Sequence, residues 1–270
     1  MRLSLAQIAN AKMETSWILS EVMELPVAQL YVQQASPVQQ ERFWQMVAQR
    51  ESGMPLQYLL GTQPFCGHSF LVQPGVLIPR PETELLCAAI INGAKQGASV
   101  LDLCCGTGCV GISAKIARAD LCVTCADVDL GCVALAQKNA QRHNVCIQTV
   151  QGDLFEPFKS EKFDVIACNP PYIPTEDIAG LQIEVRQYEP LLALDGGADG
   201  LAFYKKIALQ AQNYLHMGGQ LVLECGVGQA QDVCGLLAQN QWHKINTTAD
   251  ENGILRVVSA YKIETVRELA

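Results

Sequence analysis

Short apolar runs alternate with longer amphipathic segments from about residue 100 to the C-terminus. The apolar runs have the length and composition of buried strands, and helical periodicity follows most of them; they lie near residues 100–103, 121–126, 145–150, 163–168 and 220–225. Two further β-rich runs, 243–248 and 254–261, flank Asn252-Gly253, which is typical of a hairpin turn. Five β/α units closed by a hairpin predict an α/β fold: a doubly wound, mostly parallel seven-stranded sheet with an antiparallel edge.

The first 60 residues have a different pattern, that of a small helical domain. Ser36-Pro37-Val38-Gln39 is a helix start, with Ser at the N-cap, Pro at the first helical position and Gln at the third. An earlier helix is predicted over Thr15–Glu24. Residues 61–79 are rich in Gly, Pro and β-formers and predict a hairpin linker. The domains are thus expected at 1–60, 61–79 and 80–270, with partner recognition as the expected use of the first.

Composition narrows the class of protein. The chain has 270 residues, 49% of them hydrophobic, and no apolar run reaches the ~18 residues that a membrane span needs. Residues 1–5 are followed by polar residues rather than by a signal-peptide core, so we expect a cytoplasmic protein. The net charge is −8 and no Lys/Arg run occurs, which argues against DNA or RNA as the main substrate.

The twelve cysteines do not indicate a disulfide scaffold or a metal site. The chain is neither small nor predicted to be secreted, and most cysteines lie within apolar segments, where a reduced cysteine behaves as a small hydrophobe. Cys122-x-x-Cys125 has the spacing of a zinc or redox pair, but no second pair lies near it, and the four histidines are scattered. We therefore expect no metal.

The most informative stretch is Asn169-Pro170-Pro171-Tyr172, directly after the apolar run 163–168. The carboxyl ends of strands are where open α/β sheets bind ligands. Asn169 offers an amide oxygen that can accept a hydrogen bond from a substrate –NH2 group, and prolines present rigid carbonyls because they lack an N–H. Tyr172 adds an aromatic face. The tetrapeptide predicts a site for a planar group bearing –NH2, although a simple loop start is the alternative.

A glycine-rich turn follows the first strand of the sheet. Gly106, Gly108 and Gly111 match the GxGxxG pattern, in which glycines let a ligand approach the backbone at a helix start. Asp102 lies inside the strand, four residues before Gly106, where its charge would oppose a pyrophosphate. A carboxylate there suits a cationic ligand such as S-adenosylmethionine, or it fixes the turn by accepting backbone N–H bonds.

Three acidic residues follow the next two strands. Asp127 ends the second apolar run, at the position of a carboxylate that accepts both ribose hydroxyls of a nucleoside cofactor. Asp129 is its close rival. Asp153 follows the third run and could accept the adenine amino group, with Leu154 against the ring, or it is an ordinary turn aspartate.

Pro79-Arg80-Pro81-Glu82-Thr83-Glu84 enters a helix that is predicted to run to about residue 94. The prolines and carboxylates suit a helix start. A well-capped helix explains them, and a substrate-facing role for Arg80 and Glu82 explains them equally well. A long connection, from Tyr172 to about Gly200, is expected to act as a binding loop.

Together these segments resemble the release factor glutamine methyltransferase family, within the class I S-adenosylmethionine-dependent methyltransferases. The matching residues run from about residue 50 to the C-terminus and comprise Pro55-Leu56-Gln57-Tyr58 with Gly61, Pro79 to Glu84, Asp102 to Gly108, Asn169 to Tyr172, Glu189-Pro190 with Ala193-Leu194, and Asp199-Gly200. Asn-Pro-Pro-Tyr alone is shared with adenine methyltransferases. Cys104 and Cys105 stand where other members often carry glycine or another small residue.

The resemblance implies methylation of the side-chain amide nitrogen of the glutamine in the Gly-Gly-Gln motif of peptide chain release factors, with S-adenosylmethionine as donor. It implies that the cofactor contacts Asp127 at the ribose, Leu154 near the adenine and the turn residues Cys104, Cys105, Gly106, Thr107 and Gly108. From their own positions, Asp102, Asp153 and Asn169 are expected to contact the cofactor as well. Asn169, Pro170 and Tyr172 are expected to act in catalysis, and Pro171, Arg80 and Glu82 to join them in substrate binding.

Three other functions use parts of the same pattern. A nucleic-acid adenine methyltransferase would place a flipped base against Asn-Pro-Pro-Tyr, but it predicts a basic channel. An NAD-dependent oxidoreductase explains GxGxxG but neither Asp102 nor Asn169. A non-catalytic binding protein would not need the whole tetrapeptide.

Overall fold

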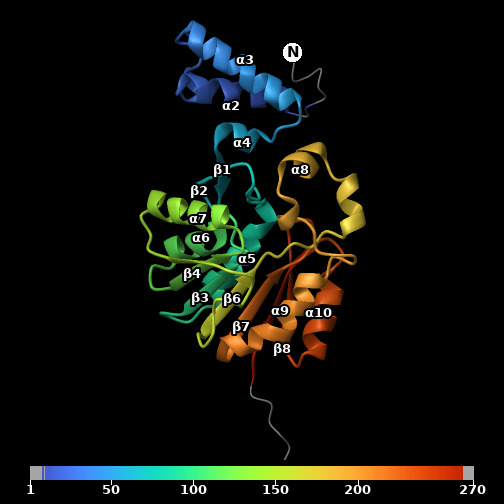
Figure 1. Cartoon of the computed structure of the whole chain (residues 1–270). Coiled ribbons are helices and arrows are strands. Elements are labelled where there is room, and N and C mark those ends of the chain that lie inside the picture. Colours follow the sequence, from blue (N-terminus) through green and yellow to red (C-terminus); the bar gives the residue numbers. More distant parts are fainter. Residues whose placement is uncertain (1–7, 9, 264–270) are drawn as a thin grey trace, which may run out of the picture.

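The structure is a computed structural model that describes residue 8 and residues 10–263 (Figure 1). Its helical domain consists of α2 (Ala11–Met23), the short η1 (Val27–Gln29), α3 (Pro37–Glu51) and α4 (Leu56–Leu60). The predicted capping box is confirmed: the Gln39 N–H donates to Ser36 Oγ (3.3 Å) and the Ser36 N–H donates to Gln39 Oε1 (2.9 Å). The prediction that the first helix begins at Thr15 is wrong, because α2 starts at Ala11. Residues 1–5, used above to judge a signal peptide, lie outside the described residues.

Seven strands of the described chain form one sheet in the order β5-β4-β3-β6-β7-β9-β8. They are β3 (Ser99–Leu103), β4 (Cys122–Asp127), β5 (Gln148–Gln151), β6 (Phe163–Cys168), β7 (Leu215–Glu224), β8 (His243–Ala249) and β9 (Leu255–Tyr261). The first five pair in parallel, and β9 is antiparallel to both β7 and β8. The predicted doubly wound, mostly parallel α/β fold is therefore confirmed.

Helices cover both faces of this sheet (Figure 1). On one face lie α5 (Glu84–Gly93), α6 (Cys109–Ala117) and α7 (Leu130–Arg142), and on the other lie α9 (Ala202–Gln210), extended by η5 (Ala211–Tyr214), and α10 (Ala230–Gln239). Each face has its own buried core, one containing Leu86, Ile90 and Ile112 and the other Phe155, Tyr204 and Leu221. Burial on both faces explains why the central strands read as continuous apolar runs.

Two segments outside the sheet differ from the prediction. The hairpin, β1 (Thr62–Phe65) with β2 (His68–Leu71), ends at Leu71, so the linker predicted as a hairpin to residue 79 is strand only in its first half. The strand predicted at 220–225 starts earlier, because β7 begins at Leu215 and Gly218 and Gly219 lie within it. Gly218 takes φ +77° and donates to the Lys262 carbonyl (2.9 Å), so the chain continues as an irregular strand.

The long connection after β6 contains α8 (Ile183–Tyr188) between the 3-10 turns η3 (Thr175–Gly180) and η4 (Leu191–Ala193). It is tied to the helical domain. Arg50 of α3, 5% exposed, donates to Glu14 Oε2 (2.6 Å) and to Glu184 Oε1 (2.7 Å) of α8. Tyr188 Oη donates to the Ser52 carbonyl (2.9 Å). The helical domain is thus joined to the long connection that carries α8 (Figure 1).

Candidate active site

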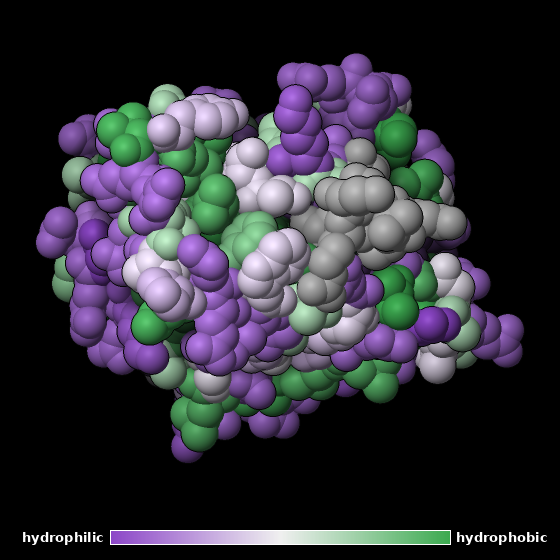
Figure 2. Space-filling model, turned by 90° about the horizontal axis from the view of Figure 1, so that it is seen from above, coloured by the Kyte–Doolittle hydropathy of each residue, from purple (hydrophilic) through white to green (hydrophobic). Residues whose placement is uncertain are grey.

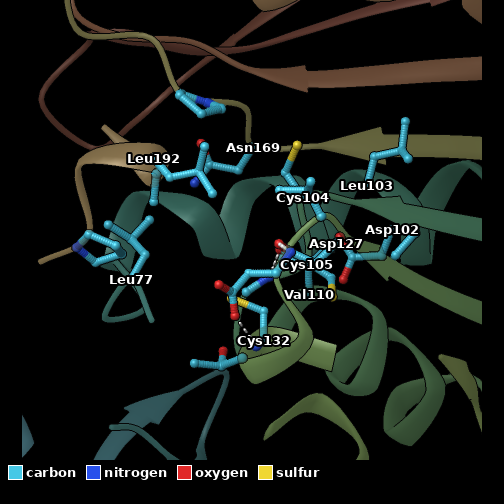
Figure 3. Close-up of a pocket in the computed structure, with 18 of the residues that line it drawn as sticks. Leu77, Asp102, Leu103, Cys104, Cys105, Val110, Asp127, Cys132, Asn169 and Leu192 are labelled. Carbon is cyan, nitrogen blue, oxygen red and sulfur yellow. Dashed lines mark hydrogen bonds between the residues drawn. The ribbon is translucent and has the colours of Figure 1, made fainter. Parts of the chain in front are cut away.

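A cavity of about 280 Å³ opens at the carboxyl ends of β3, β4 and β6, the edge at which the sequence placed the site (Figure 3). Eleven predicted site residues line it: Arg80, Asp102, Cys104, Cys105, Gly106, Thr107, Asp127, Asp153, Leu154, Asn169 and Pro171. Gly108, Pro170, Tyr172 and Glu82 do not line it. The strand order explains the convergence, because β3 lies between β4 and β6 and their ends meet at one crevice.

The glycine turn between β3 and α6 forms the floor of the cavity. Gly106 has φ +53°, and a Cβ there would have only Val76 Cγ1 nearby, at 3.8 Å, so the position is open to a ligand. Gly108 serves packing instead: with φ +76°, its Cβ would lie 2.9 Å from Ala136 Cβ. Gly106 is therefore the glycine that admits a ligand, whereas Gly108 lets α6 approach α7.

Asp102 fixes this turn. Its carboxylate is 1% exposed and accepts the Gly111 N–H (2.9 Å) and the Cys125 thiol (3.8 Å). Burial raises the pKa of its carboxyl to about 7, and the hydrogen bond from the Gly111 N–H opposes part of this rise. Of the two uses considered above, the structure shows turn fixation, and Asp102 also borders the cavity (Figure 3).

Asp127 and Asp129 both reach the cavity but have different local partners. Asp127 Oδ2 accepts the Gly106 N–H (2.9 Å), which joins the end of β4 to the glycine turn, and burial raises the pKa of its carboxyl. Asp129 is the N-cap of α7, and its Oδ1 accepts the N–H groups of Gly131 (2.6 Å) and Cys132 (3.1 Å). The Oδ1 of Asp127 also accepts the Asp129 N–H (3.0 Å), so both carboxylates have local backbone partners, and Asp127 as the ribose ligand stays a prediction.

Asn169, which directly follows β6, lines the cavity on the side of Leu192, away from Leu103 and Asp102 (Figure 3). Its Nδ2 donates to Oγ1 of Thr83 (3.3 Å), the last residue of η2 (Pro81–Thr83), and Thr83 is 3% exposed. With the –NH2 group turned toward Thr83, the amide oxygen is left to accept a hydrogen bond from a ligand.

The rest of the tetrapeptide supports Asn169. Among the described residues, no backbone N–H donates to the Pro170 carbonyl, but Pro170 does not line the cavity, so its use as a second acceptor stays a prediction. Tyr172 packs against the core on the α9 side and does not line the cavity, and its carbonyl accepts Nε2 of Gln229 (2.8 Å). Burial raises the pKa of Tyr172 to about 12. The catalytic role predicted for Tyr172 is untested, and its surroundings indicate that it holds the loop.

Arg80 joins two distant segments at the rim. Its Nη2 contacts both carboxylate oxygens of Glu189 at 2.8 Å, and its Nη1 donates to the Ile78 carbonyl (3.1 Å). Glu82 points elsewhere, 3.6 Å from Arg256, and is 38% exposed. Arg80 therefore anchors the long connection at the cavity rim, and substrate contacts by Arg80 and Glu82 stay predictions.

Sequence reasoning assigned no individual role to Thr83, Glu224 or Gln229, which lie around Asn169 and Tyr172. No local pattern marks them, because each acts on a residue at least 50 positions away.

The two cysteines with metal-like spacing differ in exposure. Cys122, the first residue of β4, is exposed, whereas Cys125 in the same strand is buried. Within residues 8 and 10–263, no three or more His, Cys, Asp or Glu side chains form a group that could hold a metal, and no helix has the length and apolarity to span a membrane.

Comparison with known proteins gives two family matches. A family model described as "Methyltransferase small domain" matches residues 81–183, and one described as "PrmC N-terminal domain" matches residues 1–61. Among solved structures, the T. thermophilus 16S rRNA N2 G1207 methyltransferase, in complex with AdoMet and guanosine, superposes with a TM-score of 0.55 at 20% identity, over 74% of this chain and 49% of that chain. This likeness shows the methyltransferase fold.

Curated relatives narrow the match further. The release factor glutamine methyltransferase of Geobacter sulfurreducens is 44% identical, with 93% of this chain and 89% of the relative aligned. That of Thermodesulfovibrio yellowstonii is 35% identical, with 94% and 93% aligned. Since the likeness spans both the helical domain and the cavity that Asn169 and Asp127 share, this chain belongs to the release factor glutamine methyltransferase family.

Proposed function

We propose that this protein transfers the methyl group of S-adenosylmethionine to the side-chain amide nitrogen of the glutamine in the Gly-Gly-Gln motif of peptide chain release factors. The observation that carries the proposal is the position of Asn169, in the same cavity as Asp127 and with its amide –NH2 held by Thr83. Family membership supports the substrate, because the named relatives are release factor glutamine methyltransferases.

The cavity fits this donor. The open backbone at Gly106 admits a ligand, the Asp127 carboxylate can accept hydroxyl hydrogen bonds, and Leu154 offers an apolar wall. Phe203 and Lys206 of α9 complete the wall on that side. When bound, S-adenosylmethionine supplies a methyl group on a positively charged sulfur, which is an excellent leaving group.

The protein's own contribution is to hold the amide. An amide nitrogen is a poor nucleophile because its lone pair is delocalised into the carbonyl. If its –NH2 group donates to Asn169 Oδ1 and the Pro170 carbonyl, the nitrogen is oriented and its lone pair turns toward the methyl group. Positioning of this kind supplies up to ~7–11 kcal/mol of barrier reduction, so no side chain is required as a strong base.

The test is mass spectrometry of a Gly-Gly-Gln-containing release factor after incubation with the protein and methyl-labelled donor. We expect one label on that glutamine, and none on a release factor whose glutamine is replaced by alanine. Asn169→Ala should abolish transfer while donor affinity, measured by calorimetry, stays near wild type. Normal turnover by Asn169→Ala would refute this role of Asn169.

The same assay decides the rival substrate. DNA and ribosomal RNA, offered in parallel, should remain unlabelled, in accord with the net charge of −8. Labelling of adenine with none on the release factor would replace the proposal. Because release factors act in translation, we expect the protein to work in the cytoplasm.

The helical domain is proposed to contact the release factor. Several of its apolar residues are exposed, including Tyr31 (96%), Val32 (78%) and Val38 (76%). The view from the helical-domain end shows apolar patches within a mainly hydrophilic surface (Figure 2). Replacing these residues should raise KM for the release factor and leave kcat unchanged.

A further inference from the structure

Glu224 is a buried carboxylate that the mechanism above does not use. It is the last residue of β7, the strand next to β6, and is 2% exposed. Its Oε2 has no hydrogen-bond partner among the described residues, and its side chain does not line the cavity. A buried carboxylate that is not fully paired costs stability, so its presence directly behind the site calls for an explanation.

The side chains around Glu224 supply one. Burial raises the pKa of its carboxyl, and side-chain hydrogen bonding from Thr83 and Asn169 lowers it. These two residues contact each other, with Asn169 Nδ2 donating to Thr83 Oγ1 at 3.3 Å. Three polar side chains therefore converge here: Thr83 and Asn169 line the cavity, and Glu224, at the end of β7, does not. An ionised carboxylate only accepts hydrogen bonds, so the neighbouring hydroxyl and amide must present their hydrogens to it.

We propose that Glu224 is a positioning residue whose ionised carboxylate keeps the –NH2 group of Asn169 turned inward and its amide oxygen turned toward the substrate nitrogen. The inference rests on the proposed function. Without the carboxylate, the Asn169 amide could rotate by half a turn. It would then present –NH2 to the substrate –NH2, two donors that cannot bond to each other.

The protonation state of Glu224 supplies a readout. Burial is the main reason that the pKa of its carboxyl is raised to about 7, with Glu82 raising it and Thr83, Arg256 and Asn169 lowering it. The other titratable groups that sense it are Tyr172, Tyr204, Cys225 and Cys109. Because the ionised form is the positioning form, methyl transfer should rise with pH through a midpoint near 7.

The experiment compares wild type with Glu224→Gln. Glutamine keeps the size of the side chain, does not titrate, and has one hydrogen-bond-accepting oxygen where the carboxylate has two. Single-turnover methyl transfer to the release factor is measured from pH 5.5 to 8.5. At pH 8 we expect Glu224→Gln to be roughly 10- to 100-fold slower, the scale for a misplaced reacting group, with unchanged donor affinity and no midpoint near 7. Glu224→Asp should recover part of the rate and restore a midpoint.

Two controls separate this effect from others. Asp164→Asn makes the same acid-to-amide change at the start of β6, where Asp164 binds Ser99 at 2.9 Å, and should retain the wild-type rate and midpoint. Asp102 also has a pKa near 7, so a midpoint that persists in Glu224→Gln but vanishes in Asp102→Asn assigns the titration to Asp102 and overturns the inference.

A direct measurement makes the result independent of turnover. In protein labelled with ¹⁵N at asparagine, the side-chain –NH2 signals of Asn169, assigned by their loss in Asn169→Ala, should shift with a midpoint near pH 7 and stop shifting in Glu224→Gln. If wild type shows this titration but labels no release factor, the proposed function fails and the Glu224–Asn169 contact stands. If wild type labels the release factor but Glu224→Gln matches it in rate and pH profile, the inference fails and the proposed function stands.

Discussion

Replacing Arg80 by methionine should destabilise the protein in a pH-dependent manner. The Arg80 guanidinium contacts both oxygens of Glu189 at 2.8 Å, and the Glu189 side chain is only 2% exposed. Methionine keeps much of the apolar stem but removes the charge and the paired N–H donors. Arg80→Met therefore leaves Glu189 as a buried carboxylate without its cation.

The expected loss is about 3 kcal/mol at pH 7.5, the lower end of the range for breaking a buried ion pair. The lower end applies because the Arg80 side chain is 30% exposed, so water can reach Glu189 once the guanidinium is gone. For a chain of this size that corresponds to a decrease in Tm of roughly 6–12 °C.

The sign of the pH effect follows from Glu189. Burial raises the pKa of its carboxyl in the folded state, and Arg80 opposes that rise. Removing Arg80 raises the folded-state pKa further above the unfolded value, so the folded variant binds a proton more readily than the unfolded chain. The deficit in unfolding free energy should therefore be largest above the folded-state pKa and shrink as the pH falls toward the unfolded value.

Urea unfolding followed by circular dichroism at pH 5 and pH 7.5 measures this deficit. Arg80→Lys is the matched control and should recover only part of the loss, because lysine keeps the charge but lacks a second nitrogen to donate to the Ile78 carbonyl. Arg80→Met combined with Glu189→Gln should recover most of it, because no buried charge remains. A deficit for Arg80→Met of equal size at both pH values would refute the reasoning.

Three further predictions concern the cavity and the loop. Asp127→Ala should weaken S-adenosylmethionine binding, measured by calorimetry, roughly 10- to 100-fold. Asp129→Ala should cost about 1 kcal/mol of stability as a lost N-cap and change donor affinity less. If Asp129→Ala weakens donor binding more than Asp127→Ala does, the ribose is assigned to Asp129. Gly106→Val should abolish donor binding, because φ +53° strains the backbone of any residue with a Cβ and because this position lines the cavity. Wild-type affinity would mean that no ligand approaches there. Arg50→Met should release Glu184 and speed limited proteolysis near α8; an unchanged cleavage rate would show that Arg50 does not hold this segment.

The sequence by itself determined the fold class and the location of the site. Alternating apolar runs and helical periodicity are local properties, and so are the capping box at Ser36 and the glycine turn at Gly106. The position of Asn169 directly after a buried strand was enough to place it at the ligand-binding edge, since strand ends in such sheets share one crevice.

Only the tertiary structure decided what surrounds that edge. The contacts Arg80–Glu189, Asn169–Thr83 and Arg50–Glu184 join positions 109, 86 and 134 residues apart. Periodicity carries no information on such pairs, because they depend on which strand ends become neighbours and on where loops return. Tyr172 shows the limit. Its place after a strand was predictable, but its side chain packs against the core on the α9 side and does not line the cavity, since burial of an aromatic ring is decided by its neighbours in space.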